Sequence, residues 1–309
     1  MINVVFLLYS WKYIERIHNY HSIPENCKDY NADIAKQQME EIESCKHQGI
    51  TYYYLLHTEK TKDIDIDYGK QEIDDYEYEL FCENKQNHSL NLREKTTILR
   101  SDFFEAKKCL EYLENLGSKN IVSWQDEQKV NQWYKLVFPQ FTKRKVVGAL
   151  CKEISPSFLQ NYARKDLVFI KTEFKEISFL TSPTLCDFEV RFILENMEEE
   201  RKLIISEPLD ICRDKHGIQE YRAWIVKNKV STLSRMTEYS SDVPTSIKNF
   251  AKNFATQHAD IFPCVYTVDF AMDKALGPVV VEMNPFVSCG RYADNSFHQF
   301  LSDLLNSKL

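Results

Sequence analysis

The stretch that decides the fold lies near the end of the chain: Val279-Val280-Val281-Glu282-Met283-Asn284-Pro285-Phe286. It is an apolar run that carries a carboxylate and an amide two residues apart, which packing alone does not explain. In a β-strand, residues i and i+2 point to the same face, roughly 6.5–7 Å apart. We therefore expect Glu282 and Asn284 to project together as oxygen ligands.

A second run of the same character, Val265-Tyr266-Thr267-Val268-Asp269-Phe270, precedes the first. If Met272 pairs with Val279 in a hairpin, Asp269 lies directly opposite Glu282. Like charges that face each other in a ladder are destabilising, and buried charges need partners. A divalent cation between the carboxylates removes the conflict, and hard oxygen ligands suit Mg²⁺. An acidic face on an exposed hairpin is the alternative. The predicted magnesium ligands are Asp269, Glu282 and Asn284.

The overall composition is that of an ordinary globular protein. The 309 residues are 43% hydrophobic and 28% charged, and this length allows one large or two to three small domains. The net charge of −7 disfavours nonspecific binding to nucleic acid. No apolar run approaches 18 residues, so we expect no membrane span. The nine cysteines form no CxxC pair, which favours reduced thiols and a cytoplasmic location.

The two halves of the chain have different patterns. In the first part, candidate strands alternate with helices, which is typical of an α/β domain. We expect its strands at 4–9, 50–56 and 96–100, and its helices at 31–47, 102–116 and 126–137. The second half mixes strands with helices on one side, which indicates α+β. We expect its strands at 168–170, 186–194, 203–205, 220–226 and 230–235, and its helices at 245–258 and 296–305.

Two features of the second half suit a phosphorylated ligand. Lys171 ends a buried strand, where its ammonium can lie over phosphates, and Lys175 follows. In Glu207-Pro208-Leu209 the proline lacks an amide donor, which leaves the Glu207 carbonyl and the Leu209 amide for an adenine edge. The alternatives are surface lysines and a plain strand end in a linker.

Two arginines lie in the predicted hairpin over 220–235. If Asn228-Lys229 is a two-residue turn, Arg222 faces Arg235, and the two repel each other unless an anion lies between them. Phosphate or a carboxylate would suit the planar guanidinium groups. The alternatives are neutralisation by nearby glutamates, or a one-residue slip that turns one arginine to the opposite face.

In this order, the features resemble the ATP-grasp superfamily, and most closely the clade named for one conserved arginine and two lysines. A more distant similarity is to the cell-division-cycle ATP-grasp proteins, which help to assemble a translation initiation factor. The resemblance covers roughly Phe138 to the C-terminus. The segments that carry it are Phe169-Ile170-Lys171…Lys175, Ser206-Glu207-Pro208-Leu209, Glu220-Tyr221-Arg222 and Val281-Glu282-Met283-Asn284-Pro285.

The resemblance implies an α+β ATP-grasp fold, in which two subdomains clasp ATP, with an N-terminal α/β pre-ATP-grasp domain. The implied domains are 1–137, 138–205 and 206–309, and the implied cofactors are ATP and Mg²⁺. The implied catalytic residues are Arg222, Arg235 and Lys171. The implied contacts are Lys171 and Lys175 to ATP phosphates, Glu207 and Leu209 to adenine, Asp210 to ribose, and Asp269, Glu282 and Asn284 to Mg²⁺.

The activity implied by the resemblance is ATP-dependent ligation of a carboxylate to an amine through an acyl phosphate. Its substrates would be small molecules, peptides or proteins, without nucleic acid or membrane partners. One departure from the family is that 173–187 contains no glycine, whereas many ATP-grasp ligases cover the nucleotide with a glycine-rich loop. An ATP-binding assembly factor or switch, and a phosphotransferase on the same fold, are therefore the alternative interpretations.

Overall fold

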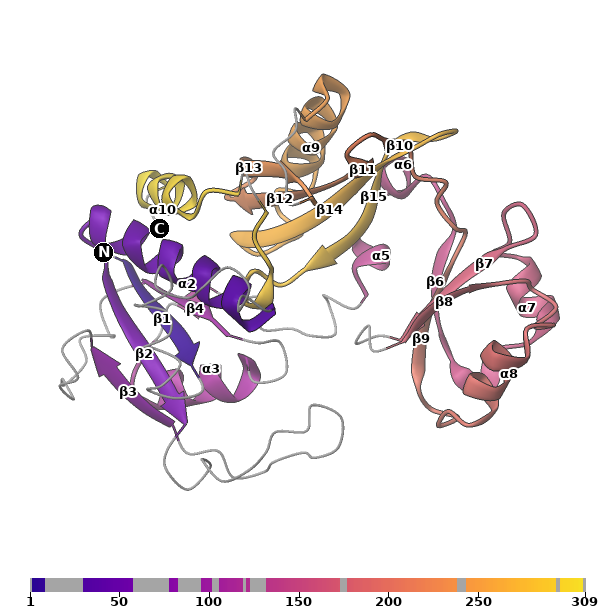
Figure 1. Cartoon of the computed structure of the whole chain (residues 1–309), viewed down its shortest axis with the longest axis horizontal. Helices are drawn as coiled ribbons and strands as arrows, with labels where there is room; N and C mark the ends of the chain where they lie inside the picture. The colour runs from indigo at the N-terminus through magenta and orange to yellow at the C-terminus, as the bar shows by residue number, and fades with distance from the viewer. Residues whose placement is uncertain are drawn as a thin grey trace.

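The structure is a computed structural model that describes ten segments of the chain. They are residues 2–8, 30–57, 78–82, 96–101, 106–118, 121–122, 132–172, 177–237, 243–292 and 295–307. Three β-sheets with helices packed on them follow one another in the molecule (Figure 1). Within these segments, no helix is both long and apolar enough to cross a bilayer.

The first sheet has the strand order β3-β2-β1-β4-β5. Its strands are parallel except for the edge strand β3. Alternate residues of β1 face opposite sides, with Phe6 towards α2 and Val5 towards α3. This confirms the predicted α/β unit. Its elements are β1 (Ile2–Leu8), α2 (Tyr30–His47), β2 (Thr51–His57), β3 (Tyr78–Cys82), β4 (Thr96–Arg100), α3 (Ala106–Asn115) and β5 (Ile121–Val122).

The second sheet has the order β6-β9-β7-β8, and its strands are antiparallel. One face is covered by helices, because Ile170 and Ile205 pack with Val190 of α8. Lys171 and Gly148 point to the opposite face, since side chains alternate along a strand. Its elements are β6 (Val146–Leu150), η4 (Cys151–Glu153), α7 (Pro156–Gln160), β7 (Val168–Thr172), β8 (Ser178–Thr181), α8 (Phe188–Glu195) and β9 (Lys202–Ser206).

The third sheet has the antiparallel order β13-β12-β14-β15. The helices α5, α6 and α9 cover the face that carries Tyr221, Tyr266 and Met283. The other face carries Arg222, Asp269, Glu282 and Asn284 of the predicted site. Its elements are α5 (Trp133–Leu136), α6 (Pro139–Thr142), β12 (Glu220–Val226), β13 (Lys229–Arg235), α9 (Thr245–Gln257), β14 (Val265–Asp273) and β15 (Gly277–Asn284), and the small ribbon β10 (Arg213–Asp214) and β11 (Gly217–Ile218) lies beside them.

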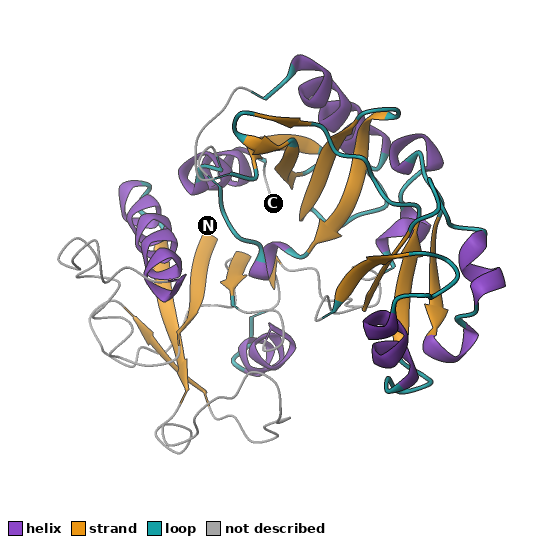
Figure 2. Ribbon diagram, turned by 45° about the vertical axis from the view of Figure 1, so that its right-hand side comes forward, coloured by secondary structure: helices purple, strands orange, loops and turns teal. Residues whose placement is uncertain are grey.

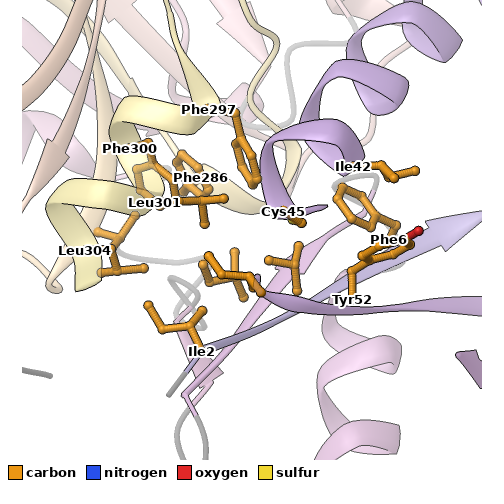
Figure 3. Close-up of a cluster of buried hydrophobic side chains, with 14 of the residues drawn as sticks. Ile2, Phe6, Ile42, Cys45, Tyr52, Phe286, Phe297, Phe300, Leu301 and Leu304 are labelled. Atoms are coloured by element: carbon orange, nitrogen blue, oxygen red, sulfur yellow. The ribbon is translucent and has the colours of Figure 1, made fainter. Parts of the chain in front are cut away.

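The last helix joins the third sheet to the first. After η5 (Phe286–Ser288), α10 (Phe297–Asn306) returns to α2, so that the two ends of the chain lie close together (Figures 1 and 2). Phe300 stacks on Phe286 with ring centroids 4.3 Å apart. The same cluster holds Phe6 and Tyr52 of the first sheet (Figure 3). One hydrophobic core therefore spans both sheets.

The predicted strand over 186–194 is wrong, because the structure has α8 there. Asp187 is the N-cap and accepts hydrogen bonds from the amides of Glu189 and Val190. Val190 and Leu194, four residues apart, form the buried face. The predicted helix over 126–137 lies partly outside the described residues, and its described part is the single turn α5.

Candidate functional site

Asp269 and Glu282 lie opposite each other on β14 and β15, as predicted. The predicted pair Met272–Val279 is nevertheless wrong, because Met272 pairs with Pro278. A bulge that adds Val281 between Phe270–Val280 and Asp269–Glu282 shifts the register by one residue. The one-residue difference at Met272 and the one-residue bulge cancel, so Asp269 and Glu282 still lie opposite each other.

Asp269 is fully buried and is held by an arginine from the neighbouring strand. Arg222 lies opposite Asp269 on β12, and its Nε and Nη2 each donate a hydrogen bond of 2.8 Å to one carboxylate oxygen. Burial alone would lower the pKa of Arg222, but the Asp269 carboxylate outweighs it and the pKa is raised. This fixed cation explains how two carboxylates can face each other in the sheet.

Asn284 and Lys171 complete the cluster. The amide nitrogen of Asn284 donates to Asp269 Oδ2 at 2.8 Å and to Glu282 Oε1 at 3.3 Å. Lys171 Nζ, from the second sheet, lies 2.7 Å from Glu282 Oε2. The predicted ligands therefore converge, and a cationic group already lies beside Glu282.

This donor set fits a hard cation. It consists of two carboxylates and the side-chain amide of Asn284. A half-turn of this amide exchanges its oxygen and nitrogen, so that it can present the oxygen to a cation. In the part of the chain that the structure describes, no three His, Cys, Asp or Glu residues gather as a metal cluster. Oxygen donors of this kind suit Mg²⁺, which takes its remaining ligands from phosphates and water.

The predicted opposition of Arg222 and Arg235 is wrong. Arg222 pairs with Ser234, and Tyr221 pairs with Arg235, so the two arginines point to opposite faces of the sheet. The turn is formed by Lys227 and Asn228, both with positive φ (42° and 65°), as a two-residue hairpin turn requires. A bulge in the β12–β13 pairing then shifts the register back by one residue, which leaves a net slip of one residue from the predicted pairing.

Arg235 has protein partners for its whole guanidinium. Its Nη1 and Nη2 each lie 2.8 Å from an oxygen of Asp214, and it donates to the carbonyls of Gly217 and Ile218. The hydrogen bonds from Arg235 lower the pKa of Asp214 to about 2. The structure therefore places Arg235 as an anchor of the β10–β11 ribbon.

The predicted adenine segment follows β9 directly. The Glu207 amide donates to the Lys145 carbonyl at 3.0 Å, and its carboxylate accepts from the Lys145 amide at 3.1 Å. Among the described residues, neither the Glu207 carbonyl nor the Leu209 amide has a hydrogen-bond partner. The Asp210 carboxylate pairs with Lys165 and Lys274. Lys175 lies outside the described residues.

Comparison with known families fits this arrangement. The matching family model describes an ATP-grasp domain, family 3 of the clade named for one arginine and two lysines, and it covers residues 151–305, half of the chain. This chain belongs to that clade of ATP-grasp proteins. No curated protein matches it.

Solved structures show the same ATP-grasp fold over nearly the whole chain. D-cycloserine synthetase DcsG is 11% identical with a TM-score of 0.56, covering 99% of both chains. The RimK domain ATP-grasp protein of Sphaerobacter thermophilus is 11% identical with a TM-score of 0.57, covering 98% of this chain and 99% of that one. The ATP-grasp ligase PsnB, complexed with precursor peptide PsnA2 and AMPPNP, is 10% identical with a TM-score of 0.52, covering 99% and 96%.

Sequence reasoning missed one arginine that lies beside this candidate site. Arg144, just before β6, donates to the carbonyl of the bulge residue Val281 at 2.9 Å. Burial lowers its pKa to about 10, and Glu282 and Asp273 offset part of this effect. It lies in a run of basic residues, Lys143-Arg144-Lys145, which gives no signal for the one that turns inward.

A hollow on the open face of the second sheet was also missed. It lies between α5 and the strands β6 and β9, and Tyr134, Lys135, Gly148 and Lys202 are among its lining residues. A Cβ at Gly148 would lie 2.0 Å from the Tyr134 hydroxyl oxygen. The available signal was a glycine inside an apolar strand, which marks a close approach.

Proposed function

We propose that this chain is an ATP-dependent carboxylate–amine ligase that uses Mg²⁺. The observation that carries the proposal is the convergence of Asp269, Glu282 and Asn284 on one face of the third sheet, with Lys171 reaching Glu282 from the second. Such a cluster between two sheets of an ATP-grasp fold suits a metal–nucleotide complex. A solved structure of PsnB in complex with a minimal precursor, Mg and ADP gives further support.

The proposed reaction has two steps. A substrate carboxylate oxygen attacks the γ-phosphorus of ATP, the bond to the β-γ bridging oxygen breaks, and ADP leaves. An amine then attacks the acyl phosphate carbon, so that an amide forms while phosphate and a proton leave. Bound Mg²⁺ would supply neutralisation of phosphate charge, as phosphoryl transfer requires.

The basic residues have different places in this proposal. Lys171 exchanges Glu282 for a phosphate when nucleotide binds, and Lys175 is proposed to contact phosphates as well. Arg222 fixes the Asp269 carboxylate rather than approaching the γ-phosphate freely. We assign no catalytic role to Arg235, because Asp214 and two carbonyls occupy it.

The adenine edge would hydrogen-bond to the Glu207 carbonyl and the Leu209 amide, since both lack partners among the described residues. A ribose contact at Asp210 would compete with its two lysine partners. The domain division at 1–137, 138–205 and 206–309 remains part of the proposal. Apart from Ser206 at the end of β9, the strands of the three sheets fall within these ranges, whereas α5 and α6 pack on the third sheet.

The substrate class is proposed to be a peptide, a protein or a small molecule that carries a carboxylate. The PsnB structure is described with its precursor peptide, and DcsG is described as a synthetase of D-cycloserine. Both substrate sizes therefore occur on this fold.

The test uses Glu282→Gln combined with Asn284→Ala. We expect ADP release in mixtures of amino acids and peptides to fall at least ~100-fold, a loss typical when charge stabilisation is removed. Mg²⁺-dependent binding of a fluorescent ATP analogue, measured separately, should also be lost. Glu195→Gln, on the exposed surface of α8, is the control. Wild-type ADP release by the double variant would refute the proposal.

Asp269 is a poor choice for this test. Its removal leaves the buried Arg222 guanidinium without its carboxylate partner, and breaking a buried pair in this way costs about 3–5 kcal/mol. A loss of activity would then report unfolding rather than a missing ligand.

The second candidate is an ATP-binding assembly or switch protein. The absence of glycine from 173–187 favours it, because a lid that excludes water is harder to build without glycine. Thermal stabilisation by Mg·ATP without any ADP formation would distinguish it from a ligase. A phosphotransferase would instead add the mass of one phosphoryl group to an acceptor.

A further inference from the structure

The outer face of α8 carries two large aromatic side chains that no described part of the chain covers. Phe188 and Phe192 are 68% and 56% exposed, and their rings stack with centroids 6.2 Å apart. Most large apolar side chains lie inside, and exposed aromatic residues are enriched at protein interfaces. This pair, which we call the α8 patch, is therefore a candidate docking surface.

The α8 patch stands on a rigid element. The opposite side of the helix buries Val190 and Leu194 against the second sheet, and Asp187 caps its first turn. Helix α8 packs on one face of the second sheet (Figure 1), the face that carries Ile170. Because side chains alternate along a strand, the α8 patch lies on the far side of that sheet from Lys171. A partner here would leave the candidate ATP site open, so this inference does not rest on the proposed function.

The charge of the segment that carries the α8 patch indicates the kind of partner. Residues 187–200 contain six carboxylates and one guanidinium, all on exposed residues. One of these carboxylates, on Glu200, pairs with Lys152, and Arg191 lies between Glu195 at 3.8 Å and the Phe188 ring at 5.9 Å. The ring face of Phe188 thus already accepts a cation.

These charges exclude several occupants. Nucleic acid and anionic lipid would meet a surface of their own sign. A second copy of the chain would place the six carboxylates of 187–200 against the same carboxylates of its partner, which like-charge repulsion disfavours. A basic segment with an apolar side satisfies both features, since its apolar residues cover the rings while its cations face the carboxylates.

We propose that the α8 patch docks a cationic amphipathic helix of a partner protein. Two rings four residues apart match apolar residues spaced i, i+3 and i+4 on such a helix. The carboxylates of 187–200 favour Lys and Arg on the polar side of the partner helix.

The test measures fluorescence anisotropy of the full chain with two labelled peptides made only of leucine and lysine. In the first, leucines recur at i, i+3, i+4 and i+7; the second has the same composition with leucines spread around the helix. We expect the first peptide to bind at least about tenfold more tightly, a difference of about 1.4 kcal/mol. Phe188→Ser with Phe192→Ser should remove that preference, and Glu198→Lys with Glu199→Lys should weaken both peptides.

Leu305→Ser, an exposed apolar position on α10, is the matched control and should bind both peptides like the wild type. Circular dichroism and the melting temperature establish that each variant is folded. Equal binding of the two peptides, no binding by the wild type, or unchanged binding by the Phe188/Phe192 variant would overturn the proposal. Self-association or vesicle binding abolished by the same variant would overturn it in favour of another occupant.

Discussion

The pair Arg222–Asp269 shows what a sequence can predict about a single residue. A carboxylate inside an apolar strand needs a partner, so Asp269 could be recognised as a special position. Its partner could not be identified, because that depends on which strand lies next to β14 and in which register. The sequence therefore led to the right carboxylates but to a wrong partner for Arg222.

His258 is a second buried residue whose state matters. It is fully buried, its Nε2 accepts from the Phe138 amide at 3.1 Å, and its Nδ1 lies 2.9 Å from the Phe254 carbonyl. Both contacts are satisfied by the neutral ring with the proton on Nδ1. Burial lowers the pKa of His258 below its ordinary value of 6.5.

We predict that this histidine makes the fold less stable in mild acid. Below pH 6.5 this histidine binds a proton in the unfolded chain but not in the folded one. The free energy of unfolding therefore decreases as the pH is lowered, until the pKa of folded His258 is reached. Melting temperatures of wild type and His258→Gln from about pH 7.5 to 5 measure this effect. At the upper end of this pH range the glutamine variant should be about 1–2 kcal/mol less stable than the wild type, and this difference should decrease as the pH is lowered. Parallel curves would contradict the prediction.

At the scale of elements, apolar runs predicted most strands, but not their registers. The runs at β1, β9 and β14 are long enough to identify a buried strand. The bulges at Val281 and in the β12–β13 hairpin add one residue without any mark in the sequence. One bulge happened to preserve the predicted pair at the site, and the other hairpin's register left the two arginines on opposite faces.

The sequence of α8 resembles that of a strand for a physical reason. Phe188, Val190, Phe192 and Leu194 alternate with other residues as in a strand. The same spacing contains two pairs four residues apart, one buried and one exposed. Because the exposed aromatic residues continue the apolar alternation, the segment resembles a strand with one apolar face. The exposed rings that make α8 a docking candidate therefore also concealed the helix.

The contact between α5 and β6 gives a prediction for an element. Gly148→Ala places a Cβ 2.0 Å from where the Tyr134 hydroxyl lies, so the end of the Tyr134 side chain must move away from the sheet. Overpacking of this kind costs about 1–3 kcal/mol. Thermal unfolding should show this loss, and Tyr134→Ala in the same chain should restore most of it. Gly217→Ala, where the added Cβ meets nothing within 4 Å but φ is +101°, is a control for backbone strain alone.

At the scale of the whole molecule, the first and third sheets share one core, whereas the second packs its own helices. This division could not be read from the sequence, because it depends on α10 returning to α2. The apolar stripe of the last helix was visible, but its partner, the first sheet, lies at the other end of the chain.

Phe300→Ala tests this shared core. The ring contacts Phe286 and Trp224, with centroids 4.3 and 5.8 Å away, and its removal should cost about 3–5 kcal/mol. Hydrogen exchange should rise in β1 and β12 together and stay unchanged in β6 and β9. Leu305→Ala, 44% exposed on the same helix, should change little. Faster exchange confined to α10 would disprove the shared core.

The return of α10 to the first strand has a consequence during synthesis. The ribosome releases β1 well before the α10 side chains that share a core with its sheet, which are those of Phe297, Phe300, Leu301 and Leu304. About 290 residues separate β1 from α10, and at about 5–20 residues per second their translation takes on the order of 15–60 s. Throughout that interval the part of the first sheet's apolar side that α10 will cover stays exposed, so we expect the growing chain to be prone to aggregation there until α10 emerges.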